Sequence, residues 1–147
     1  MKRKQFKMPR AAIQGRWFDH LGVDGKPSGL RLKVASLDSE AYQDALQEPL
    51  IRKAQEAMEG GQRGRILPSP AVQRQNQIAA LAKHILLSWD GLEEEDGQPT
   101  PNTLENRIAL LGEQPFRQAV VRFASNAAAF EEQELGNSGS TAESSLD

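Results

Sequence analysis

An acidic run that follows Trp89 has the residue types closest to those of a metal site. Its members are Asp90, Glu93, Glu94, Glu95 and Asp96. An EF-hand calcium loop needs oxygen ligands at alternate positions and a glycine at the sixth position. Counted from Asp90, the third position is Leu92 and the sixth is Glu95, so the run does not match. We therefore expect a solvated acidic loop and no bound metal.

The other residues that could take part in catalysis are few and unsuitably spaced. The histidines are His20 and His84 alone, which indicates neither a metal site nor a triad. No serine lies in the G-x-S-x-G pattern of a nucleophile elbow, and Gly22, Gly25 and Gly29 match neither phosphate-binding pattern. Cysteine is absent, which excludes disulfides and thiolate metal sites. The sequence predicts no catalytic site and no cofactor, and hence no enzyme.

Charge is distributed unevenly along the chain. Residues 1–89 carry 15 Lys and Arg against 8 Asp and Glu, a net of +7, whereas residues 90–147 carry 3 against 12, a net of −9. The two parts should attract each other, either within one fold or between neighbouring copies. Exposed charges more than about 10 Å apart are largely screened in salt, so charge alone does not choose between these arrangements. Self-association therefore stays open.

Residues 1–12 form a basic arm without periodicity. Its charged residues are Lys2, Arg3, Lys4, Lys7 and Arg10, with Phe6 among them. Such an arm can contact nucleic acid in a salt-dependent way that ignores base sequence, or it can be a solvated tail. We favour a flexible tail, because the rest of the chain is acidic and lacks aromatic stacking platforms on a sheet. No nucleic-acid partner is expected.

The periodicity of the remaining residues predicts a mainly α (α+β) fold with four to five helices and one globular domain over residues 13–135. A small antiparallel β-ribbon is expected within residues 13–35 and helices over 38–135. The small polar residues of 136–147 predict a disordered C-terminal tail. The longest strongly apolar run, Ile78 to Trp89, is far shorter than the roughly 20 residues of a membrane span, so no membrane contact is expected.

The ribbon is predicted from two alternating segments. Apolar and polar residues alternate from Ile13 to Phe18 and again from Leu30 to Val34, with a glycine-rich connection between them. A ribbon of two strands is only marginally stable in water, so it must pack on the helices. The side chains expected to make this contact are those of Trp17, Leu30, Leu32 and Val34.

Capping residues and breakers predict the first helices. Asp38 or Ser39 should cap a helix that Pro49 either kinks or restarts. Ser69 should cap the next helix, which runs from Pro70 to about Ser88 and forms the spine of the core.

The last two helices are shorter. Asn102 with Glu105 three residues later resembles a capping box, and Gly112 should end the helix that it starts. Pro115 should open the final helix, in which phenylalanines recur at helical spacing.

Apolar side chains of the C-terminal half are the candidate partner-binding residues. They are Trp89, Leu104, Ile108, Leu111, Phe116, Val120, Phe123 and Phe130. Tryptophan is frequent in interface hot spots, and apolar helix faces bind in grooves of partner proteins. In the alternative interpretation Trp89 closes the long helix and the phenylalanines form an internal seam, with Phe130 as the most exposed member. The sequence leaves both interpretations open.

Short motifs occur in a defined order along residues 13–135. They are G-R-W-F at 15–18, L-R-L-K-V at 30–34, Y-Q-D-A-L at 42–46, W-D-G-L at 89–92, D-G-Q-P-T-P at 96–101, T-L-E at 103–105, L-L at 110–111, and a helix that carries a terminal phenylalanine at 116–130. In this order they resemble the tail assembly chaperone family of long-tailed (siphovirus-like) bacteriophages.

The resemblance implies a non-enzymatic factor of tail morphogenesis. Such a factor binds the tape measure protein and recruits tail tube subunits. It would act in the host bacterial cytoplasm during assembly and be absent from the mature virion. The alternative is a structural virion component of the phage head or tail.

Overall fold

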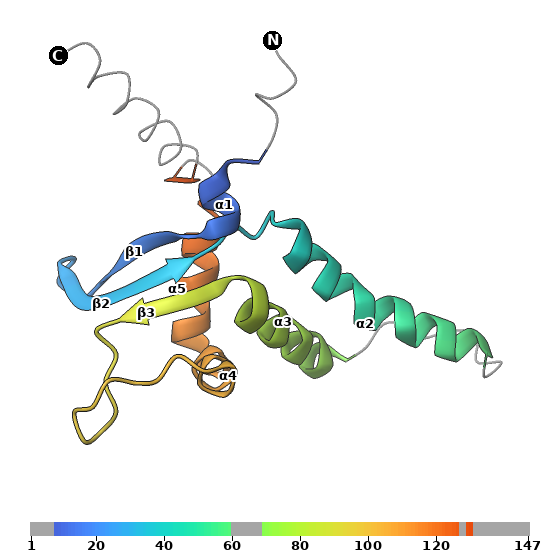
Figure 1. The fold of residues 1–147 in the computed structure, drawn as a ribbon. Helices are drawn as coiled ribbons and strands as arrows, with labels where there is room; N and C mark the ends of the chain where they lie inside the picture. Colours follow the sequence, from blue (N-terminus) through green and yellow to red (C-terminus); the bar gives the residue numbers. More distant parts are fainter. Residues whose placement is uncertain (1–7, 60–68, 127–128, 131–147) are drawn as a thin grey trace, which may run out of the picture.

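A computed structural model, which describes residues 8–59, 69–126 and 129–130, shows five helices and a small antiparallel sheet (Figure 1). In chain order the elements are α1 (Arg10–Gln14), β1 (Arg16–Leu21), β2 (Pro27–Val34), α2 (Glu40–Glu59), α3 (Pro70–His84), β3 (Leu86–Asp90), α4 (Leu104–Gly112) and α5 (Gln114–Ala124). The predicted mainly α (α+β) class is confirmed. Residues 1–7 of the predicted arm and the predicted tail from residue 136 lie outside the described residues.

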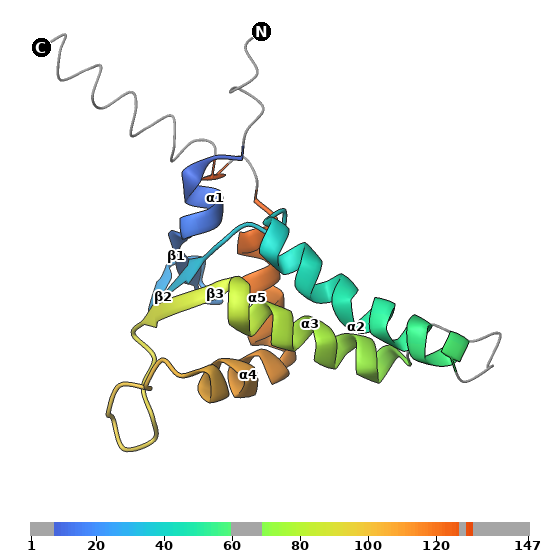
Figure 2. The same ribbon diagram turned by 45° about the vertical axis from the view of Figure 1, so that its right-hand side comes forward.

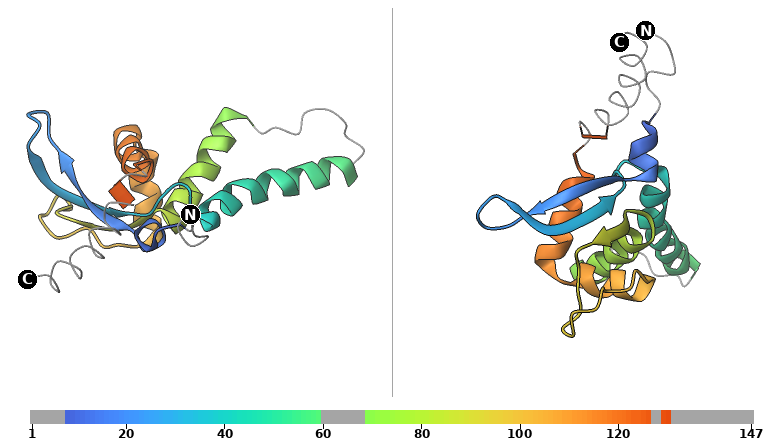
Figure 3. Two further views of the ribbon diagram at one scale, coloured as in Figure 1. Left: turned by 90° about the horizontal axis from the view of Figure 1, so that it is seen from above. Right: turned by 60° about the vertical axis from the view of Figure 1, so that its left-hand side comes forward.

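The central strand of the sheet is β2, in the order β1-β2-β3. Phe18, Leu32 and Trp89 lie opposite one another across the three strands and therefore share one face. Helix α5 packs on this face, and Figure 3 shows it crossing the sheet while α2 and α3 extend to the side. Leu32 and Val34 are 0% exposed, so the C-terminal half of β2 contributes to the hydrophobic core.

Strand β3 is the largest departure from the sequence-based prediction. A helix is predicted from Pro70 to about Ser88, but α3 ends at His84 and Leu86–Asp90 pair with β2. A short apolar run fits the period of a helix and that of a buried strand almost equally well. Pairing with β2 decides between them, because it satisfies the strand backbone and buries Leu86 completely. The predicted two-stranded ribbon is therefore a three-stranded sheet.

The inward-facing aromatic residue of β1 is Phe18, and the prediction that Trp17 packs on the helices is wrong. Trp17 pairs with Lys33 on the opposite face, where the Arg31 guanidinium lies 5.2 Å from the centre of the Trp17 ring. Successive side chains of a strand point to opposite faces, so only one of two adjacent aromatics can enter the core. The register with β2 selects Phe18.

Residues 10–14 form the short helix α1, where a flexible arm and the start of a strand are predicted. Ala11 and Ala12 are buried in a small second cluster with Phe130. The helix ends at Gly15, whose φ of 87° is readily adopted only by glycine. This prediction fails because the contact that orders the segment comes from the other end of the chain.

Hydroxyl side chains cap three of the helices. The Ser39 Oγ accepts from the Tyr42 N–H at 3.3 Å, the Ser69 Oγ from the Val72 N–H at 3.3 Å, and the Thr103 Oγ1 from the Asn106 N–H at 3.1 Å. The caps predicted at Ser39 and Ser69 are confirmed. Thr103, and not Asn102, caps α4, because the Asn102 amide donates instead to the Leu87 carbonyl at 2.9 Å.

Helix α2 continues through Pro49, where a kink or a restart is predicted. Proline removes one backbone hydrogen bond from a helix, although its fixed φ is compatible with the helical conformation. Ala45 and Leu46 before the proline pack against the core, and Leu50 after it is half-buried. Packing on both sides of Pro49 favours a single helix.

Gly91 provides a test of the close approach between the end of β3 and the start of β2. Its φ is 84°, and a Cβ at this position would lie 2.1 Å from the Gly29 carbonyl oxygen. Gly97 has a similar φ of 87° but open space around it. We expect Gly97→Ala to lower the free energy of unfolding by ~1–2 kcal/mol through backbone strain. Gly91→Ala should cost a further ~1–3 kcal/mol through overpacking. Equal losses in urea unfolding would contradict the close approach.

Tyr42, the only tyrosine of the chain, allows a second test by titration. Burial raises the pKa of its phenol above the ordinary 10.0, and a hydrogen bond with Gln77 of α3 opposes the shift. Because the unfolded chain ionises first, this residue's contribution to stability should be complete below about pH 10 and decline as the pH rises further. Phenolate absorbance should therefore appear in the native protein only above the ordinary pKa. Tyr42→Phe, which has nothing to ionise, should lack this part of the alkaline decline.

Candidate partner-binding surface

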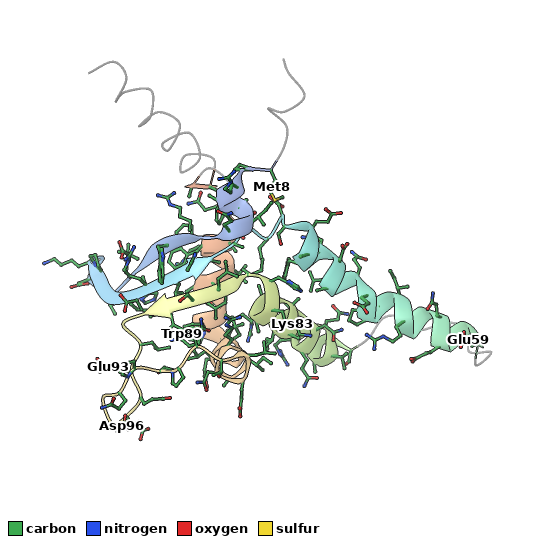
Figure 4. The ribbon with its side chains drawn as sticks, viewed as in Figure 1. Met8, Glu59, Lys83, Trp89, Glu93 and Asp96 are labelled. Carbon is green, nitrogen blue, oxygen red and sulfur yellow. The ribbon has the colours of Figure 1, made fainter. Side chains whose placement is uncertain are left out.

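Trp89 has a structural role in the fold. It is 9% exposed on β3, and its indole N–H donates to the Thr100 carbonyl at 3.0 Å. This bond ties the end of the sheet to the segment that leads into α4. Trp89 is labelled in Figure 4. The burial of the ring favours the interpretation in which Trp89 holds the scaffold together.

Phe123 and Phe130 of the C-terminal part both contact Phe18 of β1. The Phe18 and Phe123 rings stack with centroids 4.8 Å apart, and Phe130 meets Phe18 edge-on at 5.8 Å. Phe116 is partly buried against the main core, whereas Phe130 is only 1% exposed. The expectation that Phe130 would be the most exposed member is therefore wrong. Phe18 of β1 completes this aromatic cluster. The helical spacing of the other phenylalanines gives no sign of it, because Phe18 lies on a strand.

Leu111 and Val120 are also fully buried in the core. Leu104 and Ile108, in contrast, are 44% and 41% exposed. They lie four residues apart on α4 and hence on adjacent turns of one helix face. Among the candidate residues these two are the ones that the fold leaves accessible, and we call them the α4 surface.

Arg107 holds α4 in the orientation that exposes this surface. Its guanidinium donates to the Ala82 carbonyl at 3.1 Å and the Leu87 carbonyl at 3.2 Å, and its Nε donates to the Asn102 Oδ1 at 2.7 Å. The last carbonyls of a helix lack partners within that helix, so a donor to Ala82 near the end of α3 is stabilising. No local pattern in the sequence points to Arg107, because the carbonyls that it binds belong to α3 and β3.

The acidic run forms a closed turn, here called the acidic turn (residues 93–99). The Glu94 N–H donates to the Gln98 carbonyl at 2.7 Å, the Gly97 N–H to the Glu94 carbonyl at 2.9 Å, and the Gln98 N–H to the Asp96 Oδ1 at 2.9 Å. Glu93 pairs with Pro99 as an isolated bridge. The carboxylate residues of the turn are exposed, and Figure 4 shows Glu93 and Asp96 on the loop that projects from the sheet.

The described residues contain neither a cluster of metal ligands nor a helix suited to crossing a membrane. No group of three or more His, Cys, Asp or Glu side chains in the described ranges is arranged to hold a metal ion. Within those same ranges, none of the helices combines the length and apolar character that crossing a membrane requires.

Further apolar residues are exposed outside the candidate set. Leu21 and Val23, at the tip of the β1–β2 hairpin, are 55% and fully exposed, and Ile51 on α2 is 55% exposed. The sequence signal for the hairpin tip is L-G-V-D-G, where apolar residues stand inside a turn that cannot bury them. These residues provide a natural comparison for the α4 surface.

A family model described as YdaY prophage protein matches residues 37–138 of this chain. The matched range begins just before α2 and includes β3, α4 and α5, whereas β1 and β2 precede it. No curated protein and no solved structure was found that matches the chain. The family match supports a phage-associated role.

Arg107→Met tests whether the guanidinium fixes α4. Methionine keeps much of the apolar stem but removes every donor. Loss of these charge-assisted bonds should lower the free energy of unfolding by about 1.5–3 kcal/mol. Arg52→Met, at an exposed position on α2, is the matched control and should change stability by less than about 0.5 kcal/mol. Similar urea midpoints for the two variants would exclude the proposed role of Arg107.

Proposed function

We propose that this chain, which belongs to the YdaY prophage protein family, is a tail assembly chaperone that binds the tape measure protein and recruits tail tube subunits. We further propose that it is not an enzyme, that it acts in the host bacterial cytoplasm during assembly, and that it is absent from the finished virion. The prophage family supplies the phage context for this proposal. The order of motifs from Trp89 to Phe130 supplies the resemblance to tail assembly chaperones.

The exposure of Leu104 and Ile108 is the observation that carries the proposed binding role. Both side chains are more than 40% exposed on a helix whose other large apolar residues, Leu110 and Leu111, pack in or against the core. The helix is capped by Thr103 and held by Arg107, so the pair is presented from a fixed position. Apolar residues on one helix face are a usual means of binding an apolar segment of another protein. Fixed presentation reduces the entropy lost on binding.

Copurification with the tape measure protein tests this proposal. The tape measure gene of the same prophage would be coexpressed with the wild-type chain or with the double variant Leu104→Asp, Ile108→Asp. We expect the variant to retain at most about one tenth of the captured tape measure protein, because burying a carboxylate in an apolar interface is strongly unfavourable. Both positions are exposed, so the circular dichroism spectrum and melting temperature should stay close to those of the wild type.

A double variant at the hairpin tip, Leu21→Asp with Val23→Asp, is the control and should bind normally. A folded α4 variant that also binds normally would exclude this surface. Stoichiometric amounts of the chain in purified particles, measured by mass spectrometry, would instead favour a structural virion component.

A further inference from the structure

Helices α2 and α3 enclose an open groove that no part of the proposed function uses. Its volume is about 550 Å³, and Leu46 and Leu50 of α2 form an apolar part of its lining. Among the described residues, the charged ones that line it are Arg74 of α3 and Arg117 of α5, so this part of the lining carries positive formal charge. The Tyr42–Gln77 hydrogen bond links the same two helices, which supports a groove formed in the folded chain.

Neither arginine of this groove forms an ion pair with a carboxylate of the described residues. The ion pair of the described residues joins Arg31 of β2 to Asp19 of β1 at 3.3 Å. Arg117 donates to the Leu111 and Gly112 carbonyls at 2.8 and 3.3 Å, which holds its guanidinium beside the end of α4 without cancelling its charge. Arg74 is exposed and forms no ion pair with a carboxylate of the described ranges.

The acidic turn carries negative charge, opposite to that of Arg74 and Arg117, and it also lacks an ion-pair partner among the described residues. Glu93, Glu94, Glu95 and Asp96 are consecutive and exposed, and none of them forms an ion pair with a described cation. The backbone bonds within the turn hold it closed, so its carboxylates project from a defined loop. Little conformational entropy would be lost if such a loop entered a groove.

The α2 and α3 residues that line the groove lie away from the acidic turn, whereas Arg117 of α5 extends the lining to the end of α4. Figures 1 and 2 show the β3–α4 loop on one side of the sheet, whereas α2 and the start of α3 extend away on the other side. Two different surfaces that complement each other produce a head-to-tail contact, which generates rings or open chains of subunits.

We propose that this chain associates head to tail with a second copy of itself, the acidic turn of one copy binding in the Arg74–Arg117 groove of the next. The carboxylates of the turn pair with the two arginines. The apolar lining from Leu46 and Leu50 contacts the paired ends of the turn at Glu93 and Pro99. The contact needs no other protein. The lining of the groove includes neither Leu104 nor Ile108 of the α4 surface.

Sedimentation velocity of the purified full-length chain tests the proposal. We expect reversible association that strengthens with protein concentration and weakens in high salt, because exposed charges are screened. Arg74→Glu and the double variant Glu94→Lys, Glu95→Lys should each weaken the self-association constant at least about tenfold. An equimolar mixture of the two variants should associate again, since each then carries the charge that complements the other.

Matched controls distinguish this contact from a general effect of charge. Arg52→Glu matches Arg74→Glu, and Glu56→Lys makes one substitution of the type made twice in the acidic turn; both positions are exposed on α2 outside the groove, and both variants should associate like the wild type. A chain that stays monomeric at every concentration would overturn the proposal. Association that is indifferent to the Arg74→Glu change, or a mixture of variants that fails to associate, would do so as well. Circular dichroism of each variant should match that of the folded wild type.

Discussion

The antiparallel pairing of β3 with β2 is the constraint on which the rest of the structure depends. It places Leu86 opposite Val34 and Trp89 opposite Leu32, and so completes the apolar face on which α5 packs. It also brings Trp89 to the Thr100 carbonyl, which fixes the segment before α4. The Leu87 carbonyl, on the same strand, accepts from both Asn102 and Arg107. One strand of five residues thereby positions the sheet, the acidic turn and α4.

The motifs that resemble those of tail assembly chaperones serve mainly as scaffold. The W-D-G-L and P-T-P segments meet through the Trp89–Thr100 bond, and Gly91 permits the close approach to Gly29. The surfaces that we propose for binding lie between and beside these motifs, at Leu104 with Ile108 and at Arg74 with Arg117. In this proposal, binding depends on residues that the turns position and not on the turns themselves.

Local signals in the sequence predicted much of the helical part correctly. Ser39, Ser69 and Gly112 mark helix ends, because the start and the end of a helix depend on groups within a few residues of one another. The prediction failed where the deciding contact is distant. Phe18 rather than Trp17 enters the core because of the register with β2, and α1 is ordered by its contact with Phe130.

The sequence by itself determined the mainly helical class, the principal caps, the acidic run and the set of apolar candidate residues. These follow from composition and from periodicity over a few turns. Tertiary structure alone decided that residues 86–90 form a strand, that Phe130 is buried and that Leu104 and Ile108 remain exposed. The reason is that the burial of a side chain depends on which distant residues pack against it. The helical spacing of Leu104 and Ile108 does not say whether they face the core or solvent. Their exposure depends on the orientation of α4, which Arg107 and the β2–β3 pairing fix.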